Sequence, residues 1–370
     1  MNCLHVASSL SDPNPGLHSR ERPERDRFVV KRLTLEGEEG YRWDSFIKEH
    51  GSIFASASWA ALQRHGRDAA LFLGVQDDQG LCGACSIINT RRLGNFFSGR
   101  FVIQGNPVIR AGLENPGGVV DLLFDAIDRE ARRRRVLSVE FEDFWTIWPD
   151  AAGLRRHGYA VRDIKGWIVD LNGTEAELYR RVASSYRNLK NQAQKKYKII
   201  VQKSDDVETL YRLWQATYER AGKRLSADAL AYLKRVHAAL APSGTARIWL
   251  ATRDGQALSG CFNLYYGDSV YYWHGGSVSG ERYGASHLLH WSIIRDARES
   301  YRRYHMGGSR LDYENETLRK QGENIDTFKR LWGAQAHDFY WGRKVVRALG
   351  QRVFTSLIAP LLHKVRALKG

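Results

Sequence analysis

Two stretches of the chain repeat the same arrangement of apolar and polar residues. "ALFLGVQDDQGLCGACSIINT" and "ARIWLATRDGQALSGCFNLYY" each hold an apolar run, a turn at Asp78 or Asp254, and a second apolar run. Apolar runs that flank Asp and Gly are typical of β-hairpins. Aligning the two turns places Cys85 over Cys261 and gives Cys82 no cysteine counterpart. We therefore interpret the C-x-x-C spacing as a buried strand, because residues three apart on a strand face opposite sides of the sheet.

The two hairpins occupy the same place in a longer order of elements. In the first half, a helix over 56–64 precedes the hairpin, and a helix from Pro116 leads into the strand "VLSVEFEDF". The second half opens on a helix that Thr174 and Glu177 start as a capping box. After it we expect a strand at 198–204, helices near 206–221 and 226–240, the hairpin at 247–266, a strand at 270–276, a helix from 287 and a strand at 337–342. This order predicts an α/β fold of two halves, each a mixed β-sheet flanked by helices.

Chain length supports the same division, because 370 residues exceed what one ordinary core can bury. We predict a flexible leader at 1–27, a first domain at 28–165, a second domain at 166–342 that carries the main cleft, and a basic amphipathic tail at 343–370. The tail has no acidic residue, and apolar residues recur in it at helical spacing from Val346 to Leu368. We expect residues 345–370 to contact an anionic membrane surface, with a helix packed on the protein's own core as the alternative.

Charge and cysteine content narrow the class of protein further. The formal net charge of +15 attracts phosphate groups on nucleic acid, nucleotides or lipid headgroups. Four cysteines provide no disulfide framework, and the first residues lack the pattern of a secretory signal. No apolar run approaches the ~20 residues of a membrane span. We therefore expect a cytoplasmic protein, with peripheral association at the inner membrane face left open.

Three stretches of the second half carry a family resemblance. They are "SYRNLKNQAQKKYKIIV", "YYWHGGS" followed by "YGASHLLHWSIIRDARESYRRYHMGGS", and "DTFKRLWGAQAHDFYW". In this order and spacing they resemble the Fem-type (FemABX) aminoacyl transferases and their GNAT-like, BioF2-like acyltransferase relatives. The likeness extends more weakly over 28–165. The resemblance implies tandem GNAT-like domains that move an activated acyl or aminoacyl group to an amine.

The resemblance also implies a set of site residues. Lys329, in a Phe-Lys-x-x-Trp-Gly signature that we expect at the end of a strand or in a tight loop, would lie against the acceptor's phosphates or the developing oxyanion. The further substrate-binding positions are Phe328, Trp273, Tyr272, Gly275, Gly307, Gly308, Arg187, Lys190 and Arg220. From spacing alone, the basic residues among them are more typical of solvated helix faces than of a site, and strand aromatics are typical of a core.

The histidines are candidates for proton transfer rather than for a metal. His305 replaces the acidic residue that the family has before its pair of glycines, and His274 is the second candidate. We expect one of the two to accept a proton with a pKa near the ordinary value for histidine. His287 and His290 share a helix face, but no Asp or Glu joins them, so we predict no metal site.

The stretch "GERYGAS" corresponds to the loop where GNAT enzymes bind the pyrophosphate of coenzyme A. The resemblance places the donor's phosphates at Gly284, Ala285 and Ser286, in front of a helix. Glu281 stands where that loop has Gln or Arg and would repel a pyrophosphate. The sequence therefore favours aminoacyl-tRNA over acyl-CoA as the co-substrate and predicts no bound cofactor. Alternatively, Gly284 only makes the turn and Ser286 caps the helix.

The leading hypothesis is an acyltransferase that acts on the amine of a phosphorylated cell-envelope precursor, such as a peptidoglycan-type peptide. An acyl-CoA-dependent N-acetyltransferase that modifies an amino sugar of an exopolysaccharide is the nearest alternative. A non-catalytic RNA- or membrane-binding protein is the third. The net charge suits a tRNA donor through phosphate contacts, and it suits the third hypothesis equally.

Overall fold

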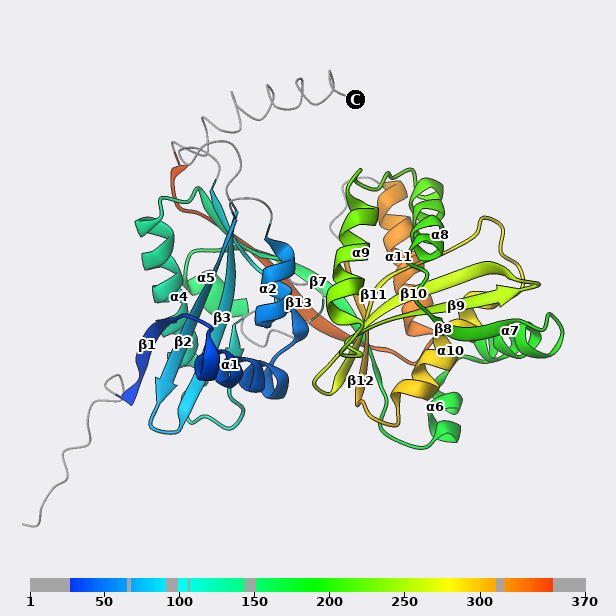
Figure 1. Cartoon of the computed structure of the whole chain (residues 1–370), viewed down its shortest axis with the longest axis horizontal. Coiled ribbons are helices and arrows are strands. Elements are labelled where there is room, and N and C mark those ends of the chain that lie inside the picture. The colour runs from blue at the N-terminus through cyan, green and yellow to red at the C-terminus, as the bar shows by residue number, and fades with distance from the viewer. Residues whose placement is uncertain are drawn as a thin grey trace, which may run out of the picture.

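The structure is a computed structural model of two α/β halves that lie side by side (Figure 1). It describes residues 27–64, 68–90, 99–105, 107–142, 145, 151–310 and 316–348. Nearly all of the predicted leader, and the predicted tail beyond Ala348, lie outside these residues. Among the helices that the structure describes, none is long and apolar enough to cross a membrane.

The first half contains the predicted hairpin and the helix that follows it. Its elements are β1 (Val29–Leu33), α1 (Gly37–His50), η2 (Ile53–Ala55), α2 (Ala57–Gln63), β2 (Ala69–Asp77), β3 (Gly80–Thr90), β4 (Arg100–Ile103), β5 (Val108–Ile109), α4 (Pro116–Arg133), β6 (Ser138–Glu142), α5 (Ala151–Arg156) and β7 (Ala160–Asp170). The helix α4 begins as predicted at Pro116, whose missing N–H costs nothing in a first turn. The side chain of Asn115 caps this helix by accepting a hydrogen bond from the Gly118 amide at 2.8 Å.

The second half repeats the order strand, two helices, hairpin, strand and helix. Its elements are α6 (Glu175–Arg181), α7 (Ser184–Lys195), β8 (Ile200–Ser204), α8 (Val207–Arg220), α9 (Ala229–Leu240), β9 (Ala246–Arg253), β10 (Gln256–Tyr266), β11 (Ser269–Ser277), α10 (Ala285–Ala297), β12 (Arg303–Arg310), α11 (Glu316–Arg330) and β13 (Gln335–Val345). The predicted capping box of Thr174 and Glu177 is present. The helix that follows is interrupted at Val182, so that one predicted helix is two.

A single mixed sheet runs through both halves. Its strand order is β1-β2-β3-β4-β6-β13-β7-β12-β11-β10-β9-β8, and β5 pairs with β3 off this path. The two halves meet at β7 and β13, which run antiparallel through the middle of the molecule (Figure 1). Each of these strands completes the sheet of the other half. The last strand of the second half, β13, pairs with β6 of the first, while β7 pairs with β12 of the second.

The strand exchange places the predicted domain limits inside strands. The limit between residues 165 and 166 divides β7, whose residues 160–168 pair with residues 335–343 of β13. The limit between residues 342 and 343 divides β13, which continues through Val345. The strands at the junction therefore pair with strands of both halves, and the first residues of the predicted tail belong to β13.

The two hairpins have like surroundings, as the repeat predicts. Cys85 packs among residues of α4, and Cys261 packs among residues of the equivalent helix α10. All three described cysteines are buried and free. Burial raises the pKa of the Cys82 thiol to about 11, and it raises the pKa values of Cys85 and Cys261 further. The C-x-x-C spacing is thus part of a core strand, because a buried thiol with a raised pKa is a poor nucleophile and metal ligand.

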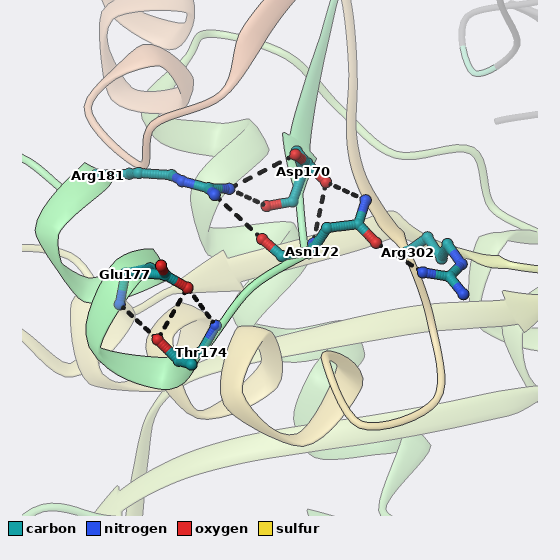
Figure 2. A network of polar contacts seen from close by, with 6 residues as sticks. All are labelled: Asp170, Asn172, Thr174, Glu177, Arg181 and Arg302. Carbon is teal, nitrogen blue, oxygen red and sulfur yellow. Dashed lines mark hydrogen bonds and ion pairs between the residues drawn. The ribbon is translucent and has the colours of Figure 1, made fainter.

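A polar network fixes the connection between β7 and α6 (Figure 2). Arg181 donates hydrogen bonds to the carbonyl oxygens of Asp170 and Asn172, both at 3.1 Å. The side chain of Asn172 donates to Asp170 Oδ1 at 2.6 Å and accepts from Arg302 at 2.8 Å. These bonds join the exchanged strand to the helix and to the turn before β12, so they set the direction in which the second half leaves the shared sheet.

Candidate functional site

The central sheet of the second half opens between two neighbouring parallel strands. The strands β11 and β12 pair only at three positions, the last of which joins Tyr271 to His305. Beyond that pair the register of β12 against β7 shifts between His305 and Gly308. Gly307 lies in this irregularity with a φ of +78°, a conformation that side chains other than glycine rarely adopt. Among the described residues, the ladder between β11 and β12 therefore ends at Tyr271 and His305, and beyond it the ring of Trp145 lies beside Gly307.

Lys329 lies at this opening. Its ammonium group donates hydrogen bonds to the carbonyl oxygens of Gly307 at 3.0 Å and Gly308 at 3.4 Å. The side chain is 6% exposed, and burial lowers its pKa from 10.5 to about 8, while the charge of Asp326 opposes the shift. The residue lies in the last turn of α11, not in a strand or tight loop as predicted. A buried lysine with a perturbed pKa beside an opened sheet is a candidate functional residue.

The rest of the Phe-Lys-x-x-Trp-Gly signature positions Lys329. Phe328 packs against Tyr186 with ring centroids 5.8 Å apart, and the Trp332 side chain is 1% exposed. Gly333 has a φ of +78°, and a Cβ at this position would lie 3.0 Å from the backbone oxygen of Arg181. The end of α11 is therefore held against α6 at a distance that only glycine allows, and this contact directs the helix onto β12.

The loop in front of α10 holds a carboxylate where the resemblance predicts donor phosphates. Gly284 is the residue before the helix, with a φ of +73°, and a Cβ there would lie 2.6 Å from the Leu189 carbonyl oxygen. Glu281 Oε1 accepts hydrogen bonds from the amides of Tyr283 at 2.5 Å and Ala285 at 3.2 Å. Ser286 does not cap the helix, since its hydroxyl is instead 2.9 Å from that of Ser259. The first amide of α10, that of Ala285, thus already has an anionic partner.

The two candidate histidines have pKa values far from the predicted one. Burial lowers the pKa of both His274 and His305 from 6.5 to about 3. The charge of Arg303 adds to this effect at His305, and the backbone of Trp145 opposes it. His274 is stacked on Trp214 with ring centroids 4.1 Å apart. Both imidazoles are neutral at neutral pH and are weaker bases than an ordinary histidine, which corrects the expectation of a pKa near 6.5.

The other two histidines belong to the core. Burial lowers the pKa of His287 to about 4 and of His290 to about 3. His290 Nδ1 lies 3.0 Å from the Tyr304 hydroxyl, and its Nε2 lies 4.0 Å from Cys261 Sγ. Across the part of the chain that the structure describes, no three His, Cys, Asp or Glu residues are grouped as metal ligands.

The predicted basic residues lie at the edges of the second half, on helices. Arg187 and Lys190 of α7 both lie over the ring of Tyr179, at 5.7 and 5.3 Å from its centroid. Arg220 of α8 donates hydrogen bonds to the carbonyl oxygen of Ser277 at 2.7 Å and to its hydroxyl at 3.2 Å. Arg220 therefore holds the end of β11, while Arg187 and Lys190 form part of the surface of α7.

The aromatic and glycine positions predicted on β11 divide between the two faces of the sheet. Tyr272 packs against His290 under α10, with ring centroids 4.9 Å apart, whereas Trp273 faces α2 and α9. A Cβ at Gly275 would lie 2.4 Å from the hydroxyl of Tyr272. At the neighbouring Gly276, a Cβ would lie 2.2 Å from a backbone oxygen of α8. These glycines therefore allow close packing of the strand.

A pocket that the sequence did not predict lies where the two halves meet. Its volume is about 250 Å³, and its lining residues come from both halves: Phe54, Trp59, Gln63, Gln104, Gly105, Glu142, Trp145, Tyr232, Trp273 and His274. Only Trp273 and His274 were candidates from the sequence. Of the first-half residues, some stand in ordinary helix and strand patterns and others lie outside helices and strands, and no local signal marks them.

Comparison with known proteins agrees with this geometry. Residues 177–315 match a family model described as an acetyltransferase (GNAT) domain. The fold resembles that of FemX, with a TM-score of 0.72, 16% identity, and coverage of 89% of this chain and 99% of that one. No curated protein matches the sequence.

Two further structures share the fold at lower similarity. A tandem GNAT protein from the clavulanic acid biosynthesis pathway has a TM-score of 0.53 and 12% identity, covering 86% of this chain and 99% of that one. L-PGS from Bacillus licheniformis has a TM-score of 0.52 and 15% identity, covering 84% and 93%. Residues 177–315 therefore match a GNAT domain within a fold similar to that of FemX, and the predicted fold class of tandem GNAT-like units is confirmed.

Proposed function

We propose that this chain transfers an acyl group from an activated donor to an amine at the opening between β11 and β12. The observation that carries the proposal is the end of strand pairing at Tyr271 and His305, with the buried Lys329 on the carbonyls just beyond it. Acyl transfer requires a carbonyl held beside donors for its developing negative charge and an amine held in line with it. An opened sheet edge supplies such fixed backbone groups.

The two faces of the sheet give the substrates separate approaches. Helix α10 and Trp332 after α11 pack in one core cluster, and α8 and α9 pack in another. The donor approaches at the start of α10, and the acceptor approaches over the face that carries α8 and α9. The two meet where β11 parts from β12. Lys329 keeps the irregular part of β12 in place and supports negative charge that develops on the carbonyl oxygen.

The donor in this proposal is an aminoacyl ester of tRNA rather than an acyl-CoA. In a GNAT site the pyrophosphate of coenzyme A needs the amides at the start of the helix. Here the carboxylate of Glu281 accepts from the amide of Ala285, the first residue of the helix, and from that of Tyr283 just before it, and it adds a negative charge. The acceptor is an amine on a cell-envelope precursor. The FemX-like fold and the net charge of +15 support this choice of substrates.

A donor-exchange experiment tests the proposal. The purified chain is offered aminoacyl-tRNA or acyl-CoA together with amine acceptors, and the products are identified by mass spectrometry. Amide formation from aminoacyl-tRNA alone is the expected result. If an amide formed from acyl-CoA alone, the donor would be acyl-CoA and not aminoacyl-tRNA. If no amide formed with either donor, the proposal of acyl transfer would be overturned.

Removing the charge of Glu281 is expected to improve coenzyme A binding. Glu281→Gln keeps a side-chain oxygen that can accept from the amides of Tyr283 and Ala285, so the loop retains its shape. We expect the Kd for coenzyme A, measured by calorimetry, to fall about tenfold, since removing one repelled charge near a phosphate is worth on the order of 1 kcal/mol. Glu299→Gln, an exposed change beyond the far end of α10, is the matched control. Tight binding of coenzyme A by the unaltered chain would contradict the role given to Glu281.

A further inference from the structure

The side chain of Lys329 has a carboxylate near it on its own helix. Asp326 lies three residues before Lys329 on α11, and residues at that spacing are neighbours on a helix surface. The charge of Asp326 raises the pKa of Lys329 against the larger, opposite effect of burial. The ammonium group itself donates to the carbonyl oxygens of Gly307 and Gly308. It therefore contacts neutral groups of β12 and is attracted by a negative charge on α11.

The carboxylate of Asp326 is fixed by a residue from a distant part of the sequence. Trp167 of β7 donates a hydrogen bond from its indole Nε1 to Asp326 Oδ1 at 2.7 Å. The helix α11 packs against both β7 and β12. Gly166, the residue before Trp167, pairs with Gly308 of β12. The indole bond thus ties the carboxylate to the same part of the sheet on which the ammonium group of Lys329 rests.

The other titratable groups on the surrounding elements are neutral or paired at neutral pH. Burial lowers the pKa of each histidine on α10, β12 and β13 that lies in this part of the fold, namely His287, His305 and His337. Lys165 of β7 forms an ion pair with Asp338 of β13. Asp326 is therefore the counter-charge that the described part of the chain offers to Lys329.

We propose that Asp326 is a positioning residue that keeps Lys329 protonated at the opening of the sheet, and that Trp167 holds its carboxylate in place. The inference rests on the proposed function, because a lysine supports a developing oxyanion only in its charged form. Since the Lys329 pKa of about 8 is close to neutral pH, losing the carboxylate would leave a large fraction of the chains with an uncharged Lys329. Asp326 would then set the upper pH limit of the reaction without contacting a substrate.

A titration of Lys329 in Asp326→Asn tests the proposal. The asparagine oxygen can still accept from the Trp167 indole, so the change removes the charge and keeps the shape. The pKa is followed in the full chain by NMR of lysine labelled at Cε, and the Lys329 signal is identified by its absence in Lys329→Met. We expect this pKa to fall by about one pH unit, the lower end of the effect of one close charge. The alkaline limb of kcat/KM should move down by the same amount.

Glu323→Gln is the matched control for Asp326→Asn. Glu323 carries the same charge on the same helix, and its side chain is 59% exposed. Asp326→Glu keeps the charge and should preserve the Lys329 pKa, which a purely structural role of Asp326 would not predict. Asp326→Ser removes the charge with a smaller side chain and serves if Asp326→Asn does not fold. A Lys329 pKa as high in the uncharged variants as in Glu323→Gln would overturn the proposal.

Trp167→Phe tests whether the indole acts through Asp326. It removes the N–H that holds the carboxylate and leaves the charge of Asp326, so we expect a smaller fall of the Lys329 pKa than in Asp326→Asn. Added to Asp326→Asn, the same change should cause no further fall. A fall of equal size in both backgrounds would mean that Trp167 acts independently of Asp326. The titration needs no substrate, so its failure leaves acyl transfer in the donor-exchange experiment intact, and an inactive chain still allows the titration.

Discussion

Replacing Lys329 with methionine is expected to lower kcat/KM for acyl transfer by about 10²–10³-fold, the loss typical of removing one fixed donor from a developing oxyanion. The methionine side chain has a similar length and fills the buried space. It removes the hydrogen bonds to Gly307 and Gly308 and the positive charge at the opening of the sheet. Steady-state kinetics with the donor that proves active would measure the change.

Lys320→Met is the matched control for this experiment. Lys320 lies on the same helix, its side chain is 66% exposed, and it forms an ion pair with Glu316 one turn away. Such exposed pairs contribute little to stability. If Lys329→Met turned over substrate as fast as Lys320→Met, the site at the opening of the sheet would be wrong.

The lowered pKa of Lys329 also makes the free energy of unfolding depend on pH, and Lys329→Met should remove this dependence. The pKa of Lys329 is about 8 in the folded chain, and its ordinary value of 10.5 applies to the unfolded chain. Between these values the unfolded state binds more protons, so the wild-type stability rises with pH. This gain in the stability of the wild-type chain is complete above pH 10.5 and is lost as the pH falls through 8. Relative to Lys329→Met, the wild-type chain should gain about 3 kcal/mol over this window in denaturant unfolding.

Local sequence patterns predict most of the helices and strands, but they do not predict which strands pair with one another in the sheet. The turns at Asp78 and Asp254, the capping box of Thr174 and Glu177, and the start of α4 at Pro116 depend on residues close in the chain, and all three kinds of signal were correct. The exchange of β7 and β13 depends on pairing between residues 160–168 and 335–343, and hydrophobic periodicity carries no information about such a partner.

The candidate site shows the same division between local and tertiary information. The sequence marked Lys329, Gly307 and Gly308, which the fold brings together, because a family resemblance covers them. It misjudged the pKa values of His274 and His305, since burial sets them and burial is a tertiary property. It also missed the pocket, whose rings come from η2, α2, α9, β11 and Trp145 after β6, because no single stretch of sequence contains it.

Ending the chain after Gly333 is expected to unfold both halves, because this truncation removes β13. The loss leaves β7 and β6 each without a neighbour in the middle of the sheet. It also removes Phe339, which is 1% exposed, and the ion pair of Lys344 with Asp128. Truncating one buried phenylalanine alone typically costs 3–5 kcal/mol, whereas a whole domain is stable by about 5–15 kcal/mol.

The measurement is thermal unfolding followed by near-ultraviolet circular dichroism, which reports on packed aromatic side chains of both halves. A chain that ends after Ala348 keeps β13 and serves as the control, with the expected melting of the full chain. Gly166→Ala tests the same junction more gently, because a Cβ there would lie 2.0 Å from the ring of Phe339. The prediction would be wrong if the chain ending at Gly333 still melted cooperatively and kept the aromatic signal of the control. Each half would then be stable without the pairing of β7 with β13.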